Sequence, residues 1–203
     1  MQPPAEHVHW LFAAGVLFLG LVVLAEAIVG REVWRRRKWR AYLWPSTLFG
    51  LGVFMWPVMV FFTNSTIHML AHSAWAQMMM LAGAAELGLV SGKLRSEWWK
   101  LCLPAALAVS GAAFLIHEAN PWLYSRSAFV HHTCGWILLV GALFPLGLAF
   151  RPRSPVFAGG YVLVIVAVSI ALYSSRDVAP VFGHLDPAAG VEHRWSGSSS
   201  PPR

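Results

Sequence analysis

Six long apolar blocks constrain this chain more than any other feature, and they lie at residues 8–30, 42–63, 67–90, 98–117, 127–150 and 155–174. Each block holds roughly the 20 residues that a helix needs to cross a hydrocarbon layer about 30 Å thick. Hydrophobic residues make up 57% of the 203 residues, and charged residues only 12%. The sequence therefore predicts an all-α integral membrane protein, built as a bundle of six transmembrane helices.

The blocks leave room for short connections only. We expect one helical membrane domain at residues 1–175 and a polar, partly disordered tail at 176–203, which ends in "SGSSSPPR". The first block is expected to remain as a membrane helix, because the preceding "MQPPAEHVH" lacks the basic residues of a signal peptide.

The basic residues lie in alternate loops and predict the orientation. Of the 15 Lys and Arg residues, "REVWRRRKWR" holds six, "SGKLRSEWWK" three and "RPRSP" two. By the positive-inside rule these loops face the cytoplasm, so both termini are expected outside. The net charge of +6 then reflects topology, and no nucleic-acid partner is expected. We expect a multi-pass protein of the bacterial plasma (inner) membrane, in contact with the lipid bilayer.

All nine histidines lie at or beyond the predicted outer boundary. A single interfacial histidine is most often an anchor or a hydrogen-bonding group. Five histidines at the ends of three successive spans indicate a metal site instead, because imidazole is a common metal ligand and is costly at membrane depth without a partner. The expected ligands are His68, His72, His117, and His131 or His132. The roles of His7, His9, His184 and His193 stay open.

The donor types near these histidines favour copper over zinc. Imidazole binds either metal, whereas thioether and thiolate groups select copper(I). Met79 follows His72 by two helical turns, and Cys134 follows His131 by one turn, although packing explains either residue equally simply. Glu118 and Asn120 are expected to orient a neighbouring imidazole.

Two carboxylates interrupt apolar blocks near the predicted cytoplasmic side. Glu26 and Glu86 are expected to pair with loop arginines or to bond between helices, and a proton or cation path is the alternative. Cys102 and Cys134 fall at opposite ends of their spans, which is too far apart for a disulfide.

Two motifs carry a family resemblance. "HMLAH" at 68–72, and "LIHEANPWLYSRSAFVHH" followed by "LLVGALFPL", resemble the cytochrome c oxidase assembly factor CtaG family over about residues 49–148. These are multi-span bacterial membrane proteins linked to copper-site assembly in haem-copper oxidases. The resemblance implies histidine positions at His68, His72, His117 and His131 or His132, with Pro121 and Tyr124 as scaffold. It also implies a cytochrome oxidase subunit or a periplasmic copper carrier as partner.

Other functions remain open at this point. One is a haem b electron carrier, with His72 and His131 or His132 as axial ligands. A second is a membrane metalloenzyme with zinc and an activated water, and a third is an accessory subunit without a metal. The sequence contains no HExxH motif and no recognisable pairing of a nucleophile with a base, so a role other than catalysis is favoured.

Overall fold

The computed structural model describes residues 5–62, 66–116 and 125–175, with side chains at 6–57, 70–116 and 129–175. These residues form helices and no strand. In chain order the elements are α1 (Ala5–Val29), α2 (Arg31–Arg35), α3 (Lys38–Phe62), α4 (Thr66–Val90), the 3₁₀ helix η1 (Glu97–Leu101), α5 (Cys102–Ile116), α6 (Ser125–Gly141), α7 (Leu143–Phe150) and α8 (Pro155–Tyr173).

The all-α class is confirmed, and each of the six apolar blocks is helical. Four segments of the described chain are long and apolar enough to cross a membrane, namely Glu6–Val29, Glu97–Ile116, Phe129–Phe150 and Pro155–Tyr173. Helices α3 and α4 have the same length as α1, 25 residues. A multi-pass membrane protein fits these helices, whereas six spans with both termini outside stays a prediction. The expected tail at 176–203 lies outside the described residues.

Local chemistry explains two interruptions of the helices, one between α1 and α2 and one between α6 and α7. Between α1 and α2, Gly30 has a φ of 86°, a conformation that residues with a Cβ rarely adopt. The fifth apolar block contains two helices, because Pro145 has no N–H to donate to the carbonyl of Gly141 and its ring displaces that carbonyl. The interruption is short, because Ala142 keeps helical backbone angles, with φ −59° and ψ −23°.

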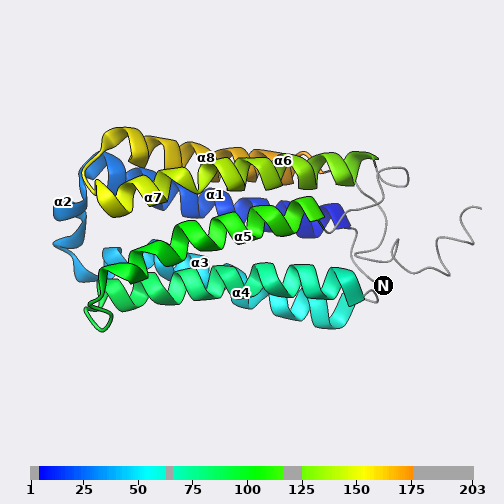
Figure 1. Ribbon diagram of the computed structural model, residues 1–203, viewed down its shortest axis with the longest axis horizontal. Coiled ribbons are helices and arrows are strands. Elements are labelled where there is room, and N and C mark those ends of the chain that lie inside the picture. The colour runs from blue at the N-terminus through cyan, green and yellow to red at the C-terminus, as the bar shows by residue number, and fades with distance from the viewer. Residues whose placement is uncertain (1–4, 63–65, 117–124, 176–203) are drawn as a thin grey trace, which may run out of the picture.

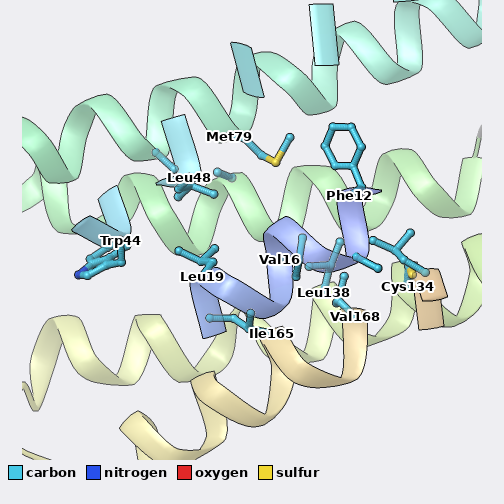
Figure 2. Packing of buried hydrophobic residues seen from close by; sticks show 14 of the residues in the cluster. Phe12, Val16, Leu19, Trp44, Leu48, Met79, Cys134, Leu138, Ile165 and Val168 are labelled. Atoms are coloured by element: carbon cyan, nitrogen blue, oxygen red, sulfur yellow. The ribbon is translucent and has the colours of Figure 1, made fainter. Parts of the chain in front are cut away.

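The long helices run antiparallel, and α1 lies between the other rods (Figure 1). Figure 2 shows the apolar core that α1 shares with its neighbours: Phe12, Val16 and Leu19 lie between Met79 of α4 and Ile165 of α8. A buried hydrogen bond adds to this packing, because Ser169 Oγ donates to the carbonyl of Ala13 at 2.8 Å.

Ion pairs hold the end of the bundle that carries the basic loops. Glu26, only 7% exposed, lies 3.3 Å from Nε of Arg31 and 3.8 Å from Nε of Arg35. This pairing confirms the expectation that Glu26 binds loop arginines. On the surface, Arg153 joins the turn before α8 to Glu32 of α2 at 2.8 Å.

Close backbone approach joins α3 to α4. A Cβ on Gly83 would lie 2.6 Å from the backbone nitrogen of Phe49, and a Cβ on Gly52 would lie 2.7 Å from the carbonyl oxygen of Ala76. Small residues of this kind let membrane helices pack closely, since van der Waals contact replaces the hydrophobic effect as the main attraction between them.

Gly83→Ala is expected to destabilise the bundle by about 1–3 kcal/mol. The new methyl group would overlap backbone atoms of α3, which cannot rotate away as a flexible side chain could. Gly50→Ala is the matched control. It adds the same methyl to α3 with nothing within 4 Å, and its higher helix propensity makes it neutral or stabilising. Thermal unfolding of both variants in detergent checks this, and equal melting temperatures would contradict the close approach.

Candidate metal site at the histidine end

The helix directions bring the histidine-bearing termini to one end of the bundle. Helices α1, α4 and α6 begin there, and α5 and α8 end there (Figure 1). We call this the histidine end, and the opposite end, with α2 and η1, the basic end. This segregation follows from antiparallel connection, because every second turn returns the chain to the same end.

A pair of imidazoles from α1 and α6 forms the centre of the site. The ring centroids of His9 and His131 lie 5.9 Å apart. His131 is buried, at 5% exposed, while His9 is partly exposed. A metal ion bonded to a nitrogen of each ring at about 2.0 Å gives centroids about 5–6 Å apart. The observed separation fits two ligands of one ion.

Aromatic rings fix His131 and connect it to α4. Phe114 of α5 stacks on His131, with ring centroids 5.5 Å apart and an interplanar angle of 25°. The ring of Trp75 meets Phe114 edge-on with centroids 4.7 Å apart, and the centroids of His72 and Trp75 are 6.5 Å apart. His72 is 7% exposed. Two aromatic side chains thus link the buried imidazoles of α4 and α6.

The end of α8 positions His9. Ser175 Oγ lies 3.4 Å from Nδ1 of His9, and Trp10 Nε1 donates to the carbonyl of Ser175 at 3.1 Å. Trp10 also packs against Tyr173, with centroids 6.0 Å apart. These contacts tie the first turns of α1 to the end of α8, so the His9 imidazole is held on the side of α1 that faces the bundle.

The space beside His72 is small. A cavity of about 10 Å³ lies between His72, Trp75, Ser110 and Phe114. That volume is close to the minimum for one water molecule. A single ion or water fits there, whereas a haem macrocycle against His72 would require Trp75 and Phe114 to move.

The structure describes the side chains of only some of the predicted site residues. Among the side chains that it describes, no three His, Cys, Asp or Glu lie close enough to hold a metal ion. The side chains of His68, His117, Glu118 and Asn120 lie outside the described residues, as do Pro121 and Tyr124. The ligand set with His68, His72, His117 and His131 or His132 therefore stays a prediction.

The remaining predicted residues belong to α4 and α6. His132 is partly exposed, next to the buried His131. Met79 is 8% exposed and Cys134 fully buried, and both belong to the apolar core. Their position fits the packing role that the sequence allowed; their role toward a metal stays a prediction.

His9 is the site residue whose role the sequence left open. Its contact with His131 joins residues 122 positions apart and depends on how α1 and α6 both pack against α8. Its place one turn into the first helix, at the predicted outer end, is the sequence feature that points to it.

Comparisons with protein-family models, with curated proteins and with solved structures give no match for this chain. The resemblance to the CtaG family stays a prediction from the two motifs quoted above.

Phe114→Ala is expected to destabilise the histidine end, because Phe114 is 4% exposed and contacts both His131 and Trp75. At roughly 24 cal/mol per Å³, a cavity of about 100 Å³ costs about 2 kcal/mol. Phe129→Ala removes the same side chain where it is 69% exposed, so it serves as the control. Thermal unfolding in detergent measures the melting temperatures of both variants. An equal decrease in the two variants would contradict this packing.

Proposed function

We propose that the protein binds one copper(I) ion at the histidine end and assists copper-site assembly of a haem-copper oxidase or a similar enzyme. His9 and His131 are two of the ligands in this proposal, and His68, His72 and His117 are the candidates for further ligands. The site faces the outside of a bacterial plasma membrane. The observation that carries the proposal is the pairing of His9 with the buried His131 across two helices.

The donor types favour copper(I) over zinc. Imidazole binds either metal, and the described part of the histidine end brings two imidazoles together. Copper(I) accepts two or three ligands and also binds the thioether and thiolate groups that occur on α4 and α6.

The unequal exposure of the two imidazoles suits temporary binding. His131 is buried and held by Phe114, so it can act as a fixed ligand. His9 is partly exposed, so an incoming donor from a partner can replace it. The expected partner is a periplasmic copper carrier or an oxidase subunit that offers its own ligands to the ion. The assembly role itself rests on the resemblance of "HMLAH" and the later histidine pair to the CtaG family.

Copper(I) titration of the detergent-purified chain against a coloured copper(I) chelator tests the proposal. One equivalent is expected to bind. His9→Ala and His131→Phe are each expected to weaken binding by at least about 100-fold, since even indirect partners of a metal cost 10–100-fold when removed. The phenyl ring of His131→Phe keeps the stack on Phe114 but offers no nitrogen.

His7→Ala is the matched control, because His7 is an exposed imidazole half a turn away on the same helix. It is expected to bind copper(I) like the wild type. Wild-type affinity in both His9→Ala and His131→Phe would overturn the proposal. A Soret absorption band in the purified protein would indicate that the site binds haem and not copper.

A further inference from the structure

The basic end contains a large cavity that the copper proposal does not use, and both charged and apolar side chains line it. Its volume is about 800 Å³, within the usual range for a ligand site, and α1, α2, α3, α4, η1, α5, α7 and α8 all contribute to its walls. Two of these elements, α2 and η1, lie at the end opposite the histidine end (Figure 1). In the predicted topology this is the depth of the lipid headgroups on the cytoplasmic side.

Most charged side chains of the cavity are already paired. Glu26 binds Arg31 and Arg35. At the rim, Lys100 pairs with Glu97, and Arg153 pairs with Glu32. These groups build the wall, and a smaller set of polar groups beside them makes no hydrogen bond or ion pair to a described residue.

Several polar groups of the cavity wall have no hydrogen bond or ion pair to any described residue, and three of them are the Glu86 carboxyl, the Arg95 guanidinium and the Tyr161 hydroxyl. Tyr161 is the most informative, because it is only 5% exposed. Buried hydroxyls almost always have a partner, so one that lines a cavity indicates a partner inside it.

The three groups differ in what they can bind. Arg95 and the Tyr161 hydroxyl donate hydrogen bonds, which suits phosphate oxygens. The Glu86 carboxylate accepts hydrogen bonds, which suits an ammonium group. Apolar side chains complete the wall, among them Val23, Leu103 and Leu148. A ligand that matches this wall carries an anion, a cation with N–H donors, and an apolar part.

We propose that this cavity binds a phosphoethanolamine group, with the phosphate at Tyr161 and Arg95 and the ammonium at Glu86. The group comes either from phosphatidylethanolamine, whose glycerol and first chain carbons contact the apolar wall, or from free phosphoethanolamine. The wall carries four carboxylates and five basic side chains. A simple anion is a poorer match, because it leaves the Glu86 carboxyl and the apolar part of the wall without a partner.

Native mass spectrometry of the full chain in detergent tests this, with added phosphatidylethanolamine, phosphatidylglycerol or phosphatidylcholine. The wild type is expected to retain phosphatidylethanolamine about tenfold better than the other two lipids, since phosphatidylglycerol lacks the ammonium and phosphatidylcholine lacks its N–H donors. Equal retention of the three lipids would overturn the proposal.

Two variants and two controls locate the binding. Tyr161→Phe and Glu86→Gln are expected to lose the preference for phosphatidylethanolamine. Tyr42→Phe removes a hydroxyl from α3 at the same end, and Lys93→Ala removes a charge two residues from Arg95; neither residue lines the cavity. Both controls are expected to behave like the wild type. If Glu86→Gln does not fold, Tyr161→Phe decides alone, and retention equal to Tyr42→Phe overturns the proposal.

An excess of free phosphoethanolamine separates the two sources. Displacement of phosphatidylethanolamine supports recognition of the headgroup from either source. Retention of the lipid, with its preference intact, supports the lipid as the ligand.

Discussion

The need to satisfy every backbone hydrogen bond within the chain governs this molecule. Inside a hydrocarbon layer no water replaces a missing partner, so apolar segments of this length form helices. Short connections between such helices force them to run antiparallel. Residues far apart in sequence then return to one of two ends, and the chemistry of each end depends on which side chains stand near the turns. Here His9, His72 and His131 lie near the starts of α1, α4 and α6 at one end, and Arg31 and Arg35 lie in α2 at the other.

The two ends fix their polar groups by different means. At the histidine end, aromatic rings hold the imidazoles. Phe114 stacks on His131, and Trp75 meets His72 edge-on. At the basic end, charge holds the groups, since Glu26 binds two arginines next to a cavity of about 800 Å³. Between the ends, α1 packs through apolar residues such as Val16 and Leu19. An apolar core thus separates the two polar ends of the bundle.

The sequence predicted the helices well because their cause is local. Apolar length places the helices of all six blocks, whereas the short interruption between α6 and α7 within the fifth block was not predicted. The pairing of Glu26 was also predictable, since Arg31 and Arg35 follow it closely in sequence. The contact of His9 with His131 was not, because it depends on how α1 and α6 both pack against α8. The cavity at the basic end was beyond prediction for the same reason: its wall combines residues from eight elements, and no single segment carries its pattern.

X-ray absorption at the copper edge of the copper(I)-loaded protein tests the central claim most directly, because it measures which atoms touch the ion. We predict nitrogen neighbours at about 2.0 Å with the outer-shell scattering of at least two imidazoles, and loss of one imidazole contribution in His9→Ala but not in His7→Ala. A first shell of sulfur alone at about 2.3 Å, or a spectrum that His9→Ala leaves unchanged, would contradict the account.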